Sequence, residues 1–179
     1  GRTKCPWNIA LPSSGSSAGS CAAVSAGLVP FAIGSETLGS IVSPCTRNAV
    51  TGMRPTYGRV SRAGAMALTW SMDKIGPIAR TVEDCALVFA AIHGADPADP
   101  TATEASFVWS PAPSLRGRRV GFVEAQFAAE SEWREAHRGA LETLRGLGAE
   151  LVPVEMPKVP GRVVSTILSA EAAAAFSDL

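Results

Sequence analysis

Two polar stretches rich in glycine and serine interrupt an otherwise apolar pattern near the N-terminus. Between them, small apolar residues at 21–28 predict a short buried helix, and the apolar run 29–33 predicts a strand. Because both polar stretches flank the same buried segment, we expect the loops that they form to lie close together. Residues 1–12 predict an extended approach to the first loop, and Pro12 makes residues 8–14 a poor candidate for a strand.

Strand and helix patterns continue downstream of the loops. Residues 50–54 predict a short strand. Thr81, followed by Glu83 and Asp84, is typical of a helix start, with a hydroxyl cap and acidic residues in the positive first turn. The apolar positions that follow share one helical face, and Gly94 predicts the end of this helix.

A strand–helix–strand pattern fills the C-terminal part. A strand at 119–123, a helix at 131–146 and a strand at 150–155 predict a βαβ unit with parallel strands. The helix carries an apolar stripe on one side and charged residues on the other. Residues 162–179 are helical in pattern up to the last residue, without an end signal, so we expect the chain to be a piece of a longer protein.

Charge and cysteine content narrow the classes of function. The chain has 16 basic and 16 acidic residues and no basic block, so direct nucleic-acid binding is not indicated. Its 4 cysteines form no C-x-x-C pair, which predicts free thiols and no metal site. The sequence has no signal-peptide pattern and no run of about 18 apolar residues. We therefore expect a cytoplasmic protein without membrane association.

The composition of the two polar loops suggests acyl transfer. Small residues let the backbone approach a ligand, so that main-chain N–H groups can face a negative charge. Acyl transfer needs a serine nucleophile, a base that takes its proton, and N–H donors directed at the developing oxyanion. Ser40, which follows Thr37, Leu38 and Gly39, satisfies the first and third of these requirements.

The same loops admit other interpretations. Stretches of this composition are commonly flexible linkers or ordinary turns. The spacing over residues 34–40 is similar to a phosphate-binding loop, but serine stands where the lysine should be. Residues 15–19 match G-x-S-x-G, the nucleophile elbow of α/β-hydrolases. That interpretation makes Ser17 the nucleophile, and it requires a preceding strand and a contact with His93 or His137.

Two segments carry a more specific resemblance: GSSAGSCAAVSAGLVPFAIGSETLGSIVSP and VTGMRPTYGRVSRAGAMALTWSMDKIGPIARTVEDCAL. Over residues 15–87 the chain resembles the amidase signature family. The resemblance implies a serine–serine–lysine triad, a variant of the nucleophile and base arrangement of serine hydrolases. In this triad Ser40 is the nucleophile, and Ser16, held in a cis peptide, relays the proton between Ser40 and the lysine.

The resemblance also implies an oxyanion hole. The backbone N–H groups of Thr37, Leu38, Gly39 and Ser40 would form it, and the hydroxyl of Ser17 would support the relay by hydrogen bonding. Removing one such donor lowers turnover by about 100-fold to 1000-fold in acyl-transfer enzymes. No cofactor is implied.

The chain departs from the family's pattern at several positions. The family's catalytic lysine lies many tens of residues before the first serine loop, outside this chain, and no lysine here matches its place. In the family, an acidic residue and an arginine usually form an ion pair that braces the nucleophile loop. This chain has Glu36 at the acidic position but Val42 at the arginine position, so we expect no ion pair of that form. Leu38 stands where the family has a glycine. The lysines of the chain are Lys4, Lys74 and Lys158.

Residues 61–77, after the short strand at 50–54, predict a long loop. It contains Met66, Trp70 and Met72. These side chains are equally suited to lining an acyl pocket and to filling the core.

The resemblance implies an α/β fold, with a mixed central β-sheet flanked by helices, of which this chain would be a part truncated at both ends. We expect one partial amidase domain over residues 1–179. Its parts would be a signature core with the serine loops at 1–95, an exposed loop at 96–117, and the βαβ unit with a final helix at 118–179.

The function implied for the full-length protein is hydrolysis of the C–N bond of a small-molecule carboxamide through a serine acyl-enzyme, with this fragment alone inactive. An alternative within the family is the A subunit of a glutamyl/aspartyl-tRNA amidotransferase, which would act with partner subunits. An alternative of another class is a noncatalytic pseudoenzyme or scaffold. Nothing in the sequence pattern indicates an oligomeric state.

Overall fold

The computed structural model describes residues 1–111, 114–128, 131–157 and 160–178. Contacts group the chain into two compact units. The serine-loop unit comprises Gly1–Trp109 and Gly161–Leu179, and the βαβ unit comprises Ser110–Pro160. The division into segments 1–95, 96–117 and 118–179 stays a prediction.

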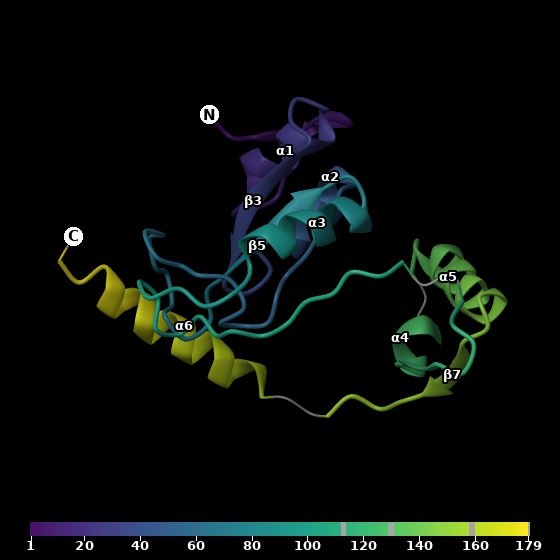
Figure 1. The fold of residues 1–179 in the computed structure, drawn as a ribbon. Coiled ribbons are helices and arrows are strands. Elements are labelled where there is room, and N and C mark those ends of the chain that lie inside the picture. Colours follow the sequence, from purple (N-terminus) through teal and green to yellow (C-terminus); the bar gives the residue numbers. More distant parts are fainter. Residues whose placement is uncertain (112–113, 129–130, 158–159, 179) are drawn as a thin grey trace. The chain divides into compact units, whose positions relative to one another are not determined.

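The serine-loop unit contains most of the helices and strands (Figure 1). In chain order these are β1 (Lys4–Cys5), β2 (Asn8–Pro12), α1 (Ala18–Ser25), β3 (Phe31–Glu36), α2 (Val42–Asn48), β4 (Thr51–Gly52), β5 (Lys74–Ala79), α3 (Val82–Ile92) and α6 (Gly161–Ala175). The βαβ unit contains β6 (Arg119–Phe122), α4 (Glu124–Ala128), α5 (Arg134–Gly146) and β7 (Glu150–Pro153). Helices alternate with strands in both units, so the predicted α/β class is confirmed.

A three-stranded antiparallel sheet lies at the centre of the serine-loop unit, with strand order β3-β5-β4. Helices α1 and α3 lie beside the β3–β5 pair in Figure 1 and contact it. The core between sheet and helices consists of Cys21, Val24, Ile41, Cys45 and Ile78. Small side chains allow this close packing, as Gly76 illustrates. A Cβ there would lie 2.1 Å from the Met53 carbonyl oxygen.

Most predicted elements of this unit are present, with shifted boundaries. Helix α1 begins at Ala18, directly after Ser17, so the first serine loop leads straight into the helix. Strand β3 extends to Glu36, and the second serine loop begins directly after it. In α3 the N-cap was predicted correctly, because the Thr81 hydroxyl accepts a hydrogen bond from the Asp84 N–H at 3.0 Å.

The expectation that residues 8–14 are a poor strand is wrong. Asn8–Pro12 forms β2, which pairs with β1 in an antiparallel ladder. Pro12 is tolerated because it is the last residue of a strand in a two-stranded sheet, where a missing N–H costs no interior ladder bond.

The βαβ unit matches the sequence pattern closely. Strands β6 and β7 are parallel, with Arg119 opposite Glu150 and Phe122 opposite Pro153. Helix α5 begins at Arg134 and ends at Gly146, and α4 is an additional short helix that the sequence pattern did not predict. In α5 Leu141 is buried against the unit, while most of the helix is exposed.

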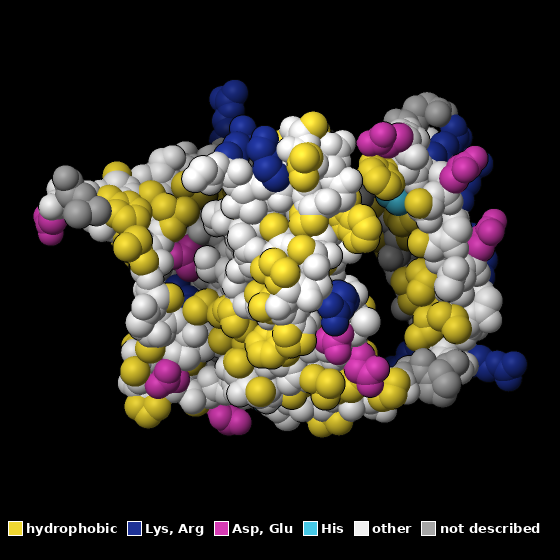
Figure 2. All heavy atoms as spheres, turned by 90° about the horizontal axis from the view of Figure 1, so that it is seen from above, with side chains coloured by type: hydrophobic (Ala, Val, Ile, Leu, Met, Phe, Trp, Pro, Cys, Tyr) yellow, Lys and Arg dark blue, Asp and Glu magenta, His cyan; other side chains and the backbone are white. Residues whose placement is uncertain are grey.

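Many apolar side chains remain at the surface. Yellow apolar groups lie over much of the face in Figure 2. In the serine-loop unit the exposed large apolar residues include Ile9, Leu28 and Met66. Across the described ranges, no helix has the length and apolarity needed to span a bilayer.

Candidate active site

The two serine loops meet, as predicted from the sequence. The Ser17 N–H donates to the Ser40 carbonyl oxygen at 3.1 Å, which joins the first loop directly to the second. The hydroxyls of Ser14 and Ser43 lie 2.7 Å apart and add a side-chain link. The first loop follows β2 and the second follows β3, so a strand holds the start of each loop.

Ser16 and Ser40 open into the same cavity. The peptide bond between Gly15 and Ser16 is cis, as the resemblance implied. Both serines line a cavity of about 260 Å³, together with Thr37 of the second loop. The two residues expected to act as nucleophile and relay are therefore placed where one bound molecule could meet both.

Ser17 is engaged by the backbone of β3. Its hydroxyl lies 3.2 Å from both the carbonyl oxygen and the N–H of Ser35, so it can donate to the first and accept from the second. This arrangement ties the start of α1 to the strand that carries the nucleophile loop. A direct role of Ser17 in the proton relay stays a prediction.

The nucleophile-elbow interpretation requires a strand before Ser17 and a histidine base near it, and the structure provides only the strand. Strand β2 does precede Ser17. However, the His93 ring stacks on Phe89 with centroids 5.3 Å apart, and His137 contacts Phe127 within the βαβ unit. Among the described residues that line the cavity there is no histidine.

The nucleophile loop takes its left-handed turn at Gly39, where φ is 101°. Glycine adopts such angles freely, whereas a branched side chain would be strained. Leu38 is exposed and is not among the described residues with positive φ. The leucine in place of the family's glycine is therefore accommodated without a left-handed backbone.

Glu36 braces this loop from inside. The carboxylate is buried, and its Oε2 accepts hydrogen bonds from the N–H groups of Ile41 (2.8 Å) and Val42 (2.9 Å). Burial acts to raise the pKa of Glu36, but these N–H donors and Arg54 outweigh it and hold the pKa below its usual value.

Arg54 provides the ion pair that the sequence pattern did not reveal. Its Nη1 lies 3.2 Å from Glu36 Oε1. The usual pairing of residues 36 and 42 is absent, as expected, but a brace for the loop is present, because the cation comes from the segment after β4. The basic side chain of Arg54 before Pro55 was the available signal in the sequence.

Asp73 holds the loop from the other side. Its Oδ1 accepts a hydrogen bond from the Thr37 hydroxyl at 2.5 Å. Its Oδ2 accepts hydrogen bonds from the N–H groups of Leu68 (2.7 Å) and Thr69 (2.9 Å). Burial acts to raise the pKa of Asp73, but the Thr37 hydroxyl and the Thr69 and Leu68 donors lower it overall. The carboxylate therefore connects the nucleophile loop to the loop before β5.

Lys74 stands at the start of β5 and also lines the cavity. Its Nζ donates to the Thr37 carbonyl oxygen at 3.2 Å and to the Met72 carbonyl oxygen. Burial first, and the nearby Arg54 charge second, lower the pKa of this lysine, while Glu36 and Asp73 oppose the shift.

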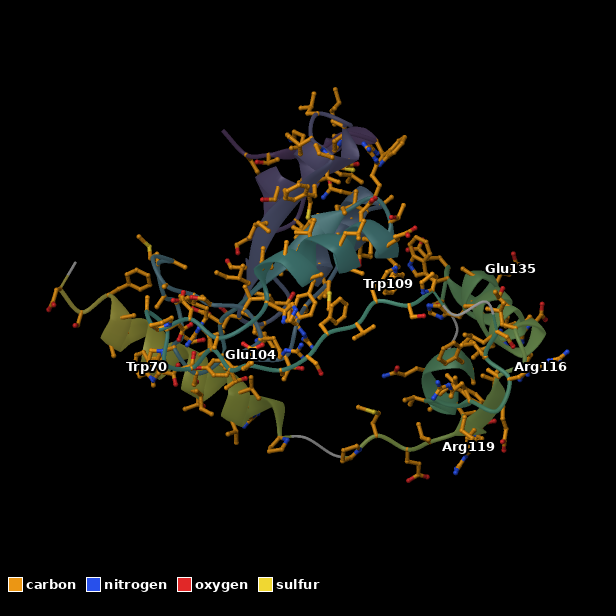
Figure 3. The ribbon with its side chains drawn as sticks, in the orientation of Figure 1. Trp70, Glu104, Trp109, Arg116, Arg119 and Glu135 are labelled. Atoms are coloured by element: carbon orange, nitrogen blue, oxygen red, sulfur yellow. The ribbon has the colours of Figure 1, made fainter. Side chains whose placement is uncertain are left out.

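Apolar side chains form one wall of the cavity. Met66, Leu68 and Trp70 line it, and an acyl-binding role for Met66 and Trp70 stays a prediction. Met72 is not among the lining residues, and its carbonyl accepts from Lys74 instead. Trp70 lies near α6 in Figure 3, and the neighbouring Ser71 hydroxyl donates to Glu171 of that helix at 2.6 Å.

Arg62 fixes the fold of the wall. Its Nη1 donates to the Trp70 carbonyl oxygen at 2.7 Å, and its Nη2 donates to the Tyr57 hydroxyl at 2.8 Å. Its Nε lies 3.6 Å from Asp99 Oδ2. Although Arg62 lines the cavity, much of its hydrogen-bonding capacity is used within the protein.

The four cysteines are free, and the thiols of Cys21 and Cys45 lie 3.6 Å apart in the core. In the described part of the chain, no three or more His, Cys, Asp or Glu side chains lie together so that they could hold a metal ion.

Comparison with known proteins gives the family. The family model described as Amidase matches residues 1–179. The chain belongs to the amidase family. Among curated relatives, the A subunit of the glutamyl-tRNA(Gln) amidotransferase of Roseiflexus castenholzii is 44% identical over 169 residues, covering 89% of this chain and 34% of the relative. The amidase chain thus spans about a third of the length of the curated relatives that it matches.

Solved amidase structures share the fold. The A subunit of the glutamyl-tRNA(Gln) amidotransferase of Thermotoga maritima superposes with a TM-score of 0.87 at 34% identity, covering 99% of this chain and 41% of that one. The native peptide amidase of Stenotrophomonas maltophilia gives a TM-score of 0.85 at 35% identity, covering 98% and 38%. The expected amidase fold is therefore confirmed.

The lysines of this amidase chain differ in their surroundings. Lys4 is exposed on β1, and Lys158 lies outside the described residues. Lys74 alone of the described lysines lines the cavity with the two serines. Nothing in the sequence motif indicated this position, although a lysine directly before the apolar residues of β5 was a visible feature.

Proposed function

We propose that the full-length protein hydrolyses a small-molecule carboxamide through an acyl-enzyme on Ser40. The observation that carries the proposal is the shared cavity of Ser16 and Ser40. Membership of the amidase family and the peptide amidase among its structural neighbours support it.

In this reaction the Ser40 hydroxyl oxygen bonds to the carbonyl carbon, and its proton passes through Ser16 to the lysine base. The N–H groups of residues 37–40 stabilise the oxyanion. Collapse of the intermediate breaks the C–N bond, and the amine leaves with the proton. Water then attacks the ester on Ser40, which releases the acid and restores the hydroxyl.

The base is proposed to lie outside this chain. The family resemblance implies a base before the first serine loop, and the Nζ of Lys74 is hydrogen-bonded to two backbone carbonyls. We therefore expect residues 1–179 alone to be inactive.

A second candidate is the A subunit of a tRNA amidotransferase. The curated relative reported above carries that name and is 44% identical to this chain over 169 residues. In that role the same acyl-enzyme chemistry would release ammonia from an amide donor for use by partner subunits. Co-purification of such subunits with the full-length protein, and glutamine hydrolysis that depends on them, would favour this candidate.

The nucleophile can be tested without knowledge of the substrate. Full-length wild type, Ser40→Ala and Ser17→Ala are treated with a fluorophosphonate, and the adduct is located by intact mass and peptide mapping. Labelling that is lost in Ser40→Ala and kept in Ser17→Ala is the expected result. Loss only in Ser17→Ala would favour the elbow, and an unlabelled wild type would favour a noncatalytic protein.

A further inference from the structure

We propose that Lys74 is a positioning residue that orients the oxyanion donors of the nucleophile loop. The inference rests on the proposed function, because it assigns how the loop that carries Ser40 is held for acyl transfer. It concerns a residue that lies well beyond both serine loops in the sequence and that the serine–serine–lysine triad does not include.

The hydrogen bonds of Lys74 point to the backbone of the loop. Its Nζ donates to the Thr37 carbonyl oxygen at 3.2 Å, and a second hydrogen bond to the Met72 carbonyl fixes the ammonium at the start of β5. Lys74 is partly buried and lines the cavity with Thr37, Ser16 and Ser40. A charged donor in such surroundings forms a stronger hydrogen bond than a neutral one.

The planarity of the peptide bond transmits this contact to an oxyanion donor. The carbonyl of Thr37 and the N–H of Leu38 belong to one peptide unit, and in a trans peptide they point in opposite directions. The cis peptide among the described residues is Gly15–Ser16, so the unit between Thr37 and Leu38 is trans. Holding the Thr37 oxygen therefore fixes the direction of the Leu38 N–H.

Thr37 is restrained from two sides. The Asp73 carboxylate accepts a hydrogen bond from the Thr37 hydroxyl, and Lys74 donates one to the Thr37 carbonyl. Consecutive residues therefore hold the side chain and the backbone of the same threonine. Glu36 pairs with Lys74 at the end of the β3–β5 ladder, and this register brings Asp73 and Lys74 next to Thr37. With both contacts present, rotation of the peptide unit would break a charge-assisted hydrogen bond.

The same contacts argue against Lys74 as the base. A base needs its nitrogen within hydrogen-bond reach of the proton that it takes. The described hydrogen bonds of Nζ go to backbone carbonyls, and none joins it to a hydroxyl of Ser16 or Ser40. Lys74 acts on the reaction through the loop, without receiving the proton.

The test measures fluorophosphonate labelling of Ser40 in the full-length protein, with both the maximal rate constant and the half-saturating concentration determined. Variants are Lys74→Met, which removes the donor, and Lys74→Gln, which keeps a neutral donor. Lys4→Met is the matched control, because it makes the same chemical change at an exposed lysine on β1. Thermal unfolding is recorded for each variant.

We expect Lys74→Met to lower the maximal labelling rate constant by about 10-fold to 100-fold, with little change in the half-saturating concentration. Lys74→Gln should recover most of this loss, and Lys4→Met should match wild type. If Lys74→Met unfolds, Lys74→Ala replaces it as the variant that lacks the donor, and the same comparison with Lys74→Gln decides.

Two results would overturn the inference. One is labelling of a folded Lys74→Met at the wild-type rate. The other is a loss in Lys74→Gln as large as in Lys74→Met, since a hydrogen-bond donor would then not suffice for positioning. An unlabelled wild type is a different outcome, because it rejects the proposed acyl-enzyme itself and the inference with it.

Discussion

The serine-loop unit buries polar side chains, while the βαβ unit has the simpler pattern of an amphipathic helix on paired strands. The buried polar or charged residues in the part of the chain that the structure describes are Ser13, Glu36, Asn48, Thr69 and Asp99, all in the serine-loop unit. In the βαβ unit the buried side chains among the described residues are apolar. Buried polar groups are usually hydrogen-bonded, and bonds to backbone groups, such as those that Glu36 accepts from Ile41 and Val42, hold the backbone in place. The comparison indicates that the first unit is specified by its polar contacts as well as by its core.

The largest expected effect concerns close packing in the serine-loop unit. In Gly76→Ala the new Cβ would lie 2.1 Å from the Met53 carbonyl oxygen and 2.7 Å from Pro55 Cδ, so the backbone must shift. We expect the free energy of unfolding to fall by about 3 kcal/mol or more. Urea denaturation of the full-length protein, with hydrogen exchange resolved by unit, measures the loss. A wild-type midpoint would contradict the packing described for the central sheet.

Removing the charge of Glu36 is expected to have the next largest effect. In Glu36→Gln an amide replaces the carboxylate that accepts from Ile41 and Val42 and pairs with Arg54. Hydrogen bonds to a buried charged group contribute about 1.5 to 3 kcal/mol. We expect a loss of stability in this range, together with slower labelling of Ser40, measured by denaturation and fluorophosphonate kinetics.

The control for Glu36 comes from the other unit. Glu135 lies exposed in the first turn of α5, where Figure 3 labels it. There Glu135→Gln should cost a few tenths of a kcal/mol, about the contribution of an exposed charge near a helix N-terminus. Equal losses in the two variants would remove the distinction between the units.

The features that could be predicted from the sequence are those that depend on local patterns. Thr81 and Gly94 mark the helix α3 through local rules, and the parallel pairing of β6 with β7 follows from element order. Ser16 and Ser40 were found because motifs name them. Arg54 was not found, because its contact with Glu36 spans 18 residues and no local pattern pairs the two.

The contact of Lys74 and the extent of β2 also could not be predicted from local sequence patterns. The contact of Lys74 with Thr37 spans 37 residues and depends on the β3–β5 register, which no local pattern encodes. Pro12 predicted a break, but its place at the end of a two-stranded sheet removed the conflict. Local rules therefore found most elements and the serines, while the residues that brace the loops required the fold.

A pH dependence of smaller size is expected at Asp99. The Thr101 hydroxyl, followed by the Arg62 N–H, lowers the pKa of Asp99 to about 2. Because this pKa lies below the unfolded value of about 3.9, the contribution is present above pH 4 and is lost as the pH falls toward 2. It amounts to at most about 2 kcal/mol.

The matched variant for this effect is Asp99→Asn, which has no carboxylate to titrate at this position. Wild type should lose more stability than the variant between about pH 5 and pH 2, measured by denaturation at each pH. Parallel pH curves for the two proteins would show that Asp99 is not held in its charged form by Thr101 and Arg62.

The smallest effect on the free energy of unfolding is expected in the βαβ unit, where the substitution should stabilise the protein. Gly139 lies inside α5, and a Cβ there would meet nothing within 4 Å. Alanine is favoured over glycine in a helix interior by about 0.8 to 1 kcal/mol, because glycine loses more backbone freedom on folding. Gly139→Ala should therefore raise the free energy of unfolding by up to this amount, with slower hydrogen exchange confined to α5. Destabilisation would mean that α5 packs as tightly as the central sheet, and the two units would then differ in their polar contacts alone.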